Sequence, residues 1–186
     1  MPRPTPRISP AVSQRAKRIK VVLMDVDGTL TDGRVWLLSQ PDGTATELKS
    51  FDAHDGAGLT LAASAGLRTG VITGRESPAV RRRAKEARIE FVYERVPLKM
   101  PVYEEILDLT GAVDEEVAYI GDDLPDIPLM ERAGLAVAVA NATPEAKRAA
   151  HYVTRAEGGR GAVREAIELI MKSQGIWKKM LVEARA

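Results

Sequence analysis

Five short apolar runs, separated by stretches with the periodicity of amphipathic helices, constrain the fold of this chain more than any other feature of its sequence. The runs are rich in β-branched residues and almost free of charge, as expected for strands that are buried on both faces. Alternation of such strands with helices predicts an α/β fold, in which a Rossmann-like parallel sheet carries helices on both faces. The five predicted strands are residues 19–25, 68–73, 89–93, 117–121 and 135–139.

The helices expected between these runs have recognisable ends. Asp55 is a candidate N-cap for a helix that ends at Gly66. Ser77 and Thr143 are each followed by proline, which combines an N-cap with the residue favoured at the first helical position. Two more amphipathic stretches predict helices, residues 101–109 with Gly111 as the stop, and a C-terminal region from residue 161. Their apolar faces are Val102, Ile106 and Leu109 in the first, and Val163, Ile167, Ile170 and Met171 in the second.

One segment departs from the alternation of strands and helices. Residues 34–39 and 45–51 are extended runs that flank a Gln-Pro-Asp-Gly-Thr turn at 40–44, so a β-hairpin is predicted after the first strand. An isolated two-stranded hairpin is barely stable and leaves open edges. We therefore expect the hairpin, residues 34–51, to pack on another surface, and a partner subunit is a good candidate.

Length and composition narrow the class of protein. A chain of 186 residues suits a single domain with a substantial core. It has no apolar run of the roughly 20 residues that a membrane span needs, and its start lacks the apolar stretch of a signal peptide, so no membrane partner is expected. It contains no cysteine, which excludes disulfides and thiolate zinc sites and fits a reducing cytoplasm.

The start of the chain is basic. The first 20 residues hold six basic side chains and no acidic one, so the remainder is net acidic although the whole chain carries a charge of +1. A basic tail can bind nucleic acid, but no aromatic-rich basic surface supports that interpretation elsewhere, and no nucleic-acid partner is expected. Residues 1–18 are predicted to be a disordered, solubilising tail, and residues 19–186 a single domain.

Four polar clusters each follow one of the first four apolar runs. In an open parallel sheet the carboxyl ends of the strands share one edge, and ligands bind there. We therefore expect carboxylates, a hydroxyl and an ammonium group from distant parts of the sequence to converge on one crevice. The clusters are Asp25-Val-Asp27-Gly28-Thr29, Thr73-Gly74-Arg75, Lys99, and Gly121-Asp122-Asp123-Leu-Pro-Asp126.

These groups suit phosphoryl transfer. Asp25 is placed to attack phosphorus and form an aspartyl phosphate, and Asp27 to protonate the leaving oxygen and then deprotonate water. Because a carboxylate and a phosphate repel each other, a cation is needed, and Asp25 and Asp122 can hold Mg²⁺. Thr73 can donate to a phosphoryl oxygen, and Lys99 supplies a further positive charge. The plainer alternative is that the acids only cap helices, but capping requires neither five acids nor Thr73 and Lys99 at one edge.

The order and spacing of the four clusters resemble the four motifs of the haloacid dehalogenase superfamily, over nearly everything after residue 18. The chain is most similar to one family within it, the 3-deoxy-D-manno-octulosonate 8-phosphate phosphatases. The matching stretches are residues 25–33, 51–58, 72–75, 118–123 and 152–165, the last with its Gly-Gly-Arg-Gly sequence at 158–161. The resemblance implies hydrolysis of that sugar phosphate to the free acid through an aspartyl phosphate, in lipopolysaccharide precursor synthesis.

The resemblance also implies which residues serve the site. Asp25, Asp27 and Asp122 would hold the metal, with Asp123 and Asp126 in support. The gaps on either side of Thr73 are too short to hold a cap domain, so the site is open within one subunit. Members of the family close it as homotetramers, in which hairpins associate at the centre and a neighbour's C-terminal tail covers the site. The hairpin and the C-terminal tail and helix, residues 155–186, fit that arrangement.

Contacts to the small phosphorylated sugar acid are also implied by the resemblance. They would come from Asp27, Asp52, Ala53, His54, Asp55, Gly56, Arg75, Arg83, Lys99 and Arg160. Two of these have a plainer alternative, since Arg83 could be an exposed helix arginine and Arg160 a solvated residue in a flexible lead-in to the last helix. Thr60 departs from relatives that carry arginine there. His54 and His151 are expected to be ordinary polar residues rather than ligands.

Three competing functions remain open at the level of sequence. A phosphatase for a nine-carbon sugar acid 9-phosphate would be similar, but those relatives tend to carry an acidic residue where Arg75 stands. A signalling receiver domain also phosphorylates an aspartate on a parallel sheet, but that aspartate follows a middle strand, and Asp27 would have no use there. A catalytically inactive homologue is disfavoured because every motif residue is present.

Overall fold

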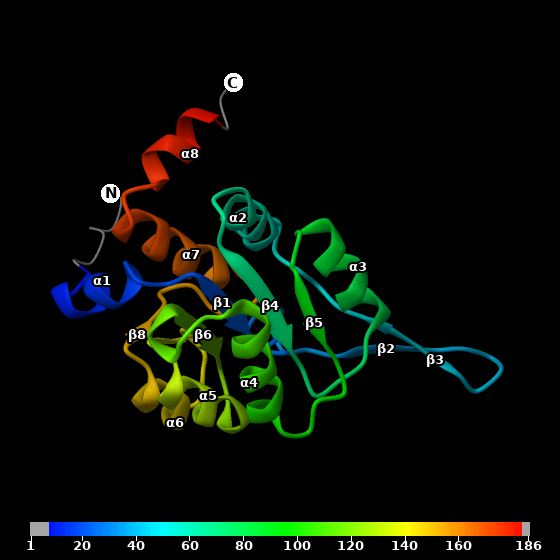
Figure 1. Cartoon of the computed structure of the whole chain (residues 1–186). Coiled ribbons are helices and arrows are strands. Elements are labelled where there is room, and N and C mark those ends of the chain that lie inside the picture. Colours follow the sequence, from blue (N-terminus) through cyan, green and yellow to red (C-terminus); the bar gives the residue numbers. More distant parts are fainter. Residues whose placement is uncertain (1–7, 184–186) are drawn as a thin grey trace.

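The computed structural model describes residues 8–183 and contains one six-stranded, fully parallel sheet (Figure 1). The strands lie in the order β5-β4-β1-β6-β7-β8, which confirms the α/β prediction. Four central strands are buried along almost their whole length. The strands are β1 Val21–Met24, β4 Arg68–Ile72, β5 Phe91–Tyr93, β6 Val117–Gly121, β7 Leu135–Ala138 and the short edge strand β8 Tyr152–Val153, which the sequence pattern missed.

Helices cover both faces of this sheet (Figure 1). On one face α1 Pro10–Ala16 and α2 Ala53–Ser64 both pack against α7 Ala162–Ser173, whose apolar face is buried as predicted. On the other face lie α4 Lys99–Thr110, α5 Ile127–Arg132 and α6 Pro144–Ala149. The remaining elements are α3 Pro78–Glu86, α8 Trp177–Glu183 and the 3-10 turns η1 Asp114–Glu116 and η2 Leu124–Asp126. None of the described helices has the length and apolar character needed to cross a membrane.

The predicted hairpin is present and projects from the body of the domain (Figure 1). Its strands, β2 Trp36–Ser39 and β3 Ala45–Leu48, are antiparallel, with Trp36 opposite Leu48. Large apolar side chains on it are exposed, with fractions of 59% for Trp36, 64% for Leu37 and 56% for Leu38. No further domain is inserted between the strands of the described chain, as predicted.

The prediction of a disordered tail through residue 18 is wrong for its second half. Helix α1 begins after Ser9, whose hydroxyl accepts a hydrogen bond from Val12 N at 3.2 Å. Val12 and Ala16 are buried, and Arg15 donates to the carbonyl oxygen of Gly134 at 2.8 Å. Burial of these apolar side chains against α7 explains the order. The rest of the predicted tail, residues 1–7, lies outside the described residues.

Two predicted helix details also need correction. Asp52, not Asp55, is the N-cap of α2, since its carboxylate accepts a hydrogen bond from His54 N at 2.6 Å. Leu109 does not share the buried face of α4 but is 58% exposed, and Tyr103 takes its place beside Ile106. The predicted helix stop at Gly111 is confirmed by its left-handed conformation, with φ of 66°.

Candidate active site

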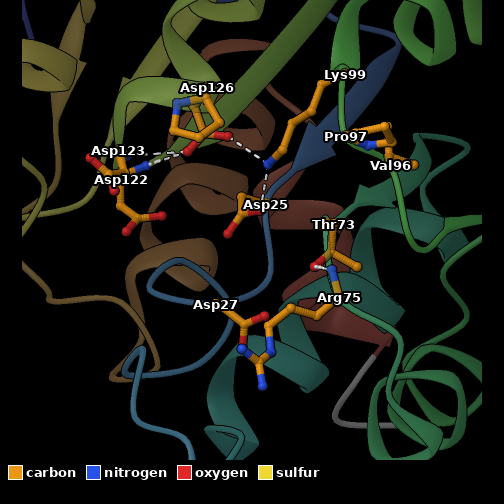
Figure 2. Close-up of a pocket in the computed structure, with 12 residues that line it drawn as sticks. Asp25, Asp27, Thr73, Arg75, Val96, Pro97, Lys99, Asp122, Asp123 and Asp126 are labelled. Atoms are coloured by element: carbon orange, nitrogen blue, oxygen red, sulfur yellow. Dashed lines mark hydrogen bonds and ion pairs between the residues drawn. The ribbon is translucent and has the colours of Figure 1, made fainter.

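The four polar clusters meet at the carboxyl edge of the sheet, around a pocket of about 280 Å³ (Figure 2). Adjacent strands deliver them. The first, second and fourth clusters lie at the ends of β1, β4 and β6, and the loop after β5 leads to the third, Lys99, at the start of α4. The predicted convergence is therefore confirmed. The pocket is lined by Asp25, Asp27, Thr73, Gly74, Arg75, Val96, Pro97, Lys99, Asp122, Asp123, Pro125 and Asp126.

A buried ion-pair cluster forms the floor of this pocket. Lys99 Nζ lies 2.5 Å from Asp25 Oδ1 and 2.8 Å from Asp126 Oδ1 (Figure 2). Asp126 is held by Tyr119, whose hydroxyl donates to Oδ1 at 2.8 Å, and by the amide of Asp122, which donates to Oδ2 at 2.9 Å. Since both oxygens of Asp126 are engaged, this carboxylate fixes Lys99 beside Asp25.

Burial dominates the electrostatics of the acidic groups. It raises the pKa of Asp25 to about 6, because Lys99 offsets only part of the burial and Asp126 adds repulsion. Burial, with repulsion from Asp25 and Asp126, raises the pKa of Asp122 to about 7. Burial alone would lower the pKa of Lys99, but the two carboxylates beside it raise it. The single ammonium group of Lys99 thus faces several carboxylates, and the cluster has more negative than positive charge.

The carboxylates present fit a hard divalent cation. Oxygen atoms of Asp25, Asp122 and Asp126 all lie within 4.8 Å of one another, and Mg²⁺ prefers a few carboxylate oxygens. Asp126 supports the site, as predicted, because Lys99 and Tyr119 donate to its Oδ1 and the amides of Asp122 and Asp123 donate to its Oδ2. The ligand role of Asp27 stays a prediction. The raised pKa values of Asp25 and Asp122 show that their charges are not balanced by protein groups alone. Asp25 and Asp122 would therefore hold the metal through carboxylate oxygens, and Asp126 would orient Lys99 beside them.

The loop after β1 is shaped around this cluster. Gly28 has φ of 109°, and a Cβ there would lie 2.1 Å from Asp122 Oδ2, so no side chain fits. Thr29 donates to Asp122 Oδ1 at 2.9 Å. Thr73 is buried at the pocket, and its Oγ1 accepts from Arg75 N at 3.3 Å, which leaves its O–H free to donate. Asp123 caps η2 by accepting a hydrogen bond from Leu124 N at 2.8 Å. For this acid, the plainer alternative of helix capping applies.

Sequence reasoning missed two residues that reach the site from the hairpin. Lys49 forms an ion pair with Asp27 Oδ1, and its side chain has no exposed surface. Glu47 lies 3.9 Å from Lys49 Nζ and 3.3 Å from Arg75 Nη2. The sequence held one signal for this pair. Glu47 and Lys49 are two residues apart on a predicted strand, and alternate residues of a strand point to the same side.

Other residues predicted to contact substrate lie at the start of α2, outside the pocket lining. Ala53 and His54 are exposed, and Asp52 caps the helix. Gly56 makes room for Arg83, since a Cβ would lie 2.1 Å from Arg83 Nη2. Arg83 donates to the carbonyl oxygen of Asp52 at 2.8 Å and is only 20% exposed, so it is not the freely exposed arginine of the plainer alternative.

Asp55 has structural partners instead. It is fully buried and accepts hydrogen bonds from Arg164 N at 2.7 Å and Gly161 N at 3.2 Å. Asp55 therefore caps α7, the helix packed against its own. Thr60, the departure from the family pattern, donates to the carbonyl oxygen of Gly56 at 3.0 Å. His151 accepts a hydrogen bond from Ala136 N at 2.9 Å, as expected of an ordinary polar residue.

The segment 158–161 packs within its own subunit. Gly159 N donates to the carbonyl oxygen of Thr29 at 3.1 Å, and Gly158 N donates to Asn141 Oδ1 at 2.8 Å. Arg160 is 62% exposed and lies 3.7 Å from Glu157. The backbone of this segment therefore supports the nucleophile loop, while the Arg160 side chain is left to solvent or to a neighbouring subunit.

Comparisons with known proteins agree with this geometry. A haloacid dehalogenase-like hydrolase family model matches residues 92–167. The 3-deoxy-D-manno-octulosonate 8-phosphate phosphatase of Salmonella typhimurium is 39% identical over 168 residues, 90% of this chain and 87% of that protein.

Two crystal structures of such phosphatases are also similar. The enzyme from Yersinia pestis has a TM-score of 0.87 at 40% identity, over 92% of this chain and 90% of that one. The enzyme from Moraxella catarrhalis, in complex with magnesium ion, phosphate ion and KDO, has a TM-score of 0.87 at 37% identity, over 92% and 97%. This chain therefore belongs to the 3-deoxy-D-manno-octulosonate 8-phosphate phosphatase family of haloacid dehalogenase-like hydrolases.

Proposed function

We propose that this chain is a magnesium-dependent phosphatase that hydrolyses 3-deoxy-D-manno-octulosonate 8-phosphate to the free sugar acid and inorganic phosphate, in lipopolysaccharide precursor synthesis. The observation that carries this function is the buried cluster in which Asp25 lies beside Lys99 and within 4.8 Å of two further carboxylates. Relatives that share most of the chain bear that name, and the Moraxella enzyme binds magnesium, phosphate and KDO.

The first half of the reaction transfers the phosphoryl group to Asp25. A carboxylate oxygen of Asp25 attacks phosphorus, and the bond from phosphorus to the sugar oxygen breaks with its electron pair going to that oxygen. Asp27 donates a proton to the leaving oxygen. Thr73, whose O–H is free, donates to a phosphoryl oxygen, and Lys99 offsets negative charge beside the nucleophile.

The second half releases phosphate. Asp27, now a carboxylate, takes a proton from water while the water oxygen attacks phosphorus, and the bond from phosphorus to Asp25 breaks. Asp25 returns as a carboxylate and inorganic phosphate leaves. When bound, Mg²⁺ neutralises negative charge at the carboxylates and the phosphate. Because Asp27 lines the same pocket as Asp25, the aspartyl phosphate has a base beside it and does not persist, unlike that of a receiver domain.

We also propose that the chain acts as a homotetramer joined through the hairpin. The hairpin carries four large apolar side chains that each expose more than half of their surface, namely Trp36, Leu37, Leu38 and Leu48. Such a cluster of exposed apolar groups is typical of a protein–protein interface. The pocket has no covering domain in the described chain, so a neighbour's C-terminal region is proposed to close it. The location in a reducing cytoplasm stays a prediction.

A phosphate-release assay across sugar phosphates tests the proposed function. The expected result is a kcat/KM for 3-deoxy-D-manno-octulosonate 8-phosphate well above that for a nine-carbon sugar acid 9-phosphate, with activity lost in excess chelator and restored by Mg²⁺. Asp25→Asn, which is nearly isosteric, is the inactive control. Preference for the nine-carbon substrate would select the related phosphatase, and activity of Asp25→Asn within tenfold of wild type would exclude covalent catalysis by Asp25.

A further inference from the structure

The hairpin sends two charged side chains into the active site. Along β3 and the residue after it, Glu47 and Lys49 point to the catalytic loop, whereas Thr46 and Leu48, which alternate with them, are exposed. Period-two alternation puts the first pair on one side of the strand and the second on the other. The hairpin therefore has one face for the site and one for solvent or a partner.

Lys49 is the most buried charge that the hairpin supplies. Its side chain has no exposed surface, and its ammonium group pairs with Asp27 Oδ1. Burying an ammonium group is costly unless it is paired. Glu47 adds a second carboxylate 3.9 Å away, and Arg75 holds Glu47 from the other side at 3.3 Å. Four alternating charges thus link the proton-transfer residue to the pocket wall.

The pairing leaves the two oxygens of Asp27 unequal. Oδ1 is engaged by Lys49, whereas Oδ2 is buried and has no hydrogen-bond partner among the residues that the structure describes. A buried acceptor without a partner is unfavourable, so a partner that enters the pocket would satisfy it. A carboxylate held through one oxygen is fixed in rotation, so the other oxygen has a defined direction for receiving a proton from water or giving one to the leaving group.

We propose that Lys49 is a positioning residue, which clamps Asp27 through Oδ1 and so aims Oδ2 at the reacting oxygen. The carboxylate of Glu47, 3.9 Å away, offsets part of the buried charge of Lys49. The role of Lys49 rests on the proposed phosphatase function. It makes the hairpin part of the catalytic machinery. A one-residue slip in the pairing of β2 with β3 would turn Lys49 away from the site, so the observed register, with Leu37 opposite Glu47, matters for turnover.

The plainer alternative is that Lys49 and Asp27 form an ion pair that only fastens the hairpin to the body. The two roles differ in what they predict for kinetics. An ion pair that only fastens the hairpin affects stability and every step alike. A clamp on Asp27 affects the steps that need proton transfer, and its removal has no further effect once Asp27 itself has been replaced.

Steady-state and pre-steady-state kinetics of Lys49→Met test the clamp. With the sugar phosphate, kcat should fall about 10²-fold, the loss typical of a misplaced catalytic group, while KM stays close to that of wild type. With p-nitrophenyl phosphate, whose leaving group needs no proton, phosphorylation of Asp25 should remain fast and its hydrolysis become slow. A burst of about one equivalent of p-nitrophenol per site is therefore expected.

A double-mutant cycle completes the test. On the Asp27→Asn background, Lys49→Met should lower kcat by less than about threefold further, because the two residues act as a unit. Thr46→Val, on the opposite face of β3, is the matched control and should leave turnover unchanged. Equal losses on the two backgrounds, or turnover of Lys49→Met equal to wild type, would overturn the clamp. A wild-type chain without phosphatase activity would instead refute the proposed function.

Discussion

Gly158 lies so close to Gly28 that a Cβ on Gly158 would fall 1.7 Å from the Gly28 carbonyl oxygen. Gly28 belongs to the loop that carries Asp25 and Asp27, and Gly158 belongs to the segment that leads into α7. Since no real Cβ approaches an oxygen so closely, the absence of a side chain at 158 is a condition for the observed loop. The segment 158–161, part of the stretch that matches the family, therefore packs directly against the catalytic loop and constrains its shape.

Gly158→Ala should displace the catalytic loop. Because the methyl group would meet backbone rather than a flexible side chain, we expect a loss of about 1–3 kcal/mol in the free energy of unfolding, together with a lower kcat. Urea denaturation and steady-state assays measure the two effects. Gly74→Ala is the control for stability, because its Cβ would meet nothing nearer than the Val96 carbonyl oxygen at 3.7 Å. Wild-type stability and activity of Gly158→Ala would contradict the close contact.

Asp55→Asn separates a structural role from substrate binding. Both carboxylate oxygens of Asp55 accept from backbone amides at the start of α7, and an amide group cannot accept at both positions. We expect a loss of about 1–3 kcal/mol in unfolding free energy from the donor left unpaired, with KM for the sugar phosphate unchanged. A rise in KM at wild-type stability would instead favour the substrate contact that the family resemblance implies.

How far sequence reasoning reached can be seen in Asp25 and Lys49. The site of Asp25 could be predicted, because parallel strands place their carboxyl ends at one edge whatever the details of packing. Lys49 could not, because a charged residue in an amphipathic hairpin resembles a solvated one. The spacing of two between Glu47 and Lys49 indicates that they share a face of the strand. Which surface that face meets depends on how the hairpin leaves the body, and no local pattern encodes that.

The same limit explains the errors elsewhere. Helix α1 is seven residues long and buries only Val12 and Ala16, so it carries no periodic signal. Val12 is ordered only because α7 offers it a partner surface. The predicted N-cap of α2, Asp55, and the observed one, Asp52, differ by three residues. This difference is decided by α7, whose N-terminus needs the carboxylate of Asp55.

Magnesium should stabilise the protein more at high pH than at low pH. Without metal, raised acid pKa values favour folding at low pH, since the folded state keeps protons that the unfolded chain loses near pH 4. That contribution is present below the unfolded value and is lost as pH rises through the folded values of about 6 for Asp25 and about 7 for Asp122. Above those values the carboxylates are free to bind metal.

Thermal denaturation measures this dependence. The rise in Tm on adding Mg²⁺ should be large at about pH 8 and small at about pH 5, where protons occupy the ligands. Asp122→Asn removes one of the two raised groups and should flatten the dependence as well as weaken the effect of Mg²⁺. A metal-induced rise in Tm that does not change with pH would contradict the assignment of Asp25 and Asp122 as ligands.

The proposed assembly can be tested on the exposed face of the hairpin. Leu38→Arg puts a charge on a side chain that is 56% exposed, so the fold of one subunit should tolerate it, whereas an apolar interface between hairpins should not. Light scattering should then show a smaller species than wild type, and kcat/KM for the sugar phosphate should fall. Thr46→Val, also exposed on the hairpin, should leave the assembly intact. An unchanged molar mass for Leu38→Arg would exclude this face.

Arg160 offers a test of substrate recognition between subunits. A truncation ending at Thr154 cannot serve, because it removes α7, whose Val163, Ile167 and Ile170 belong to the core. Arg160→Ala is a milder change, because the side chain is 62% exposed and its ion pair, with Glu157 three residues earlier, is long at 3.7 Å. Arg148 is a matched control, being 67% exposed with Glu145 three residues earlier.

If a neighbour's Arg160 contacts the sugar acid, Arg160→Ala should lower kcat/KM for the sugar phosphate by about 10-fold or more, as loss of a charge-assisted hydrogen bond predicts. It should lower kcat/KM for p-nitrophenyl phosphate far less, because that ester has no carboxylate and is too short to reach a covering segment. Arg148→Ala should change neither value. Equal losses on both substrates would indicate general destabilisation, and no loss on either would show that Arg160 is merely solvated.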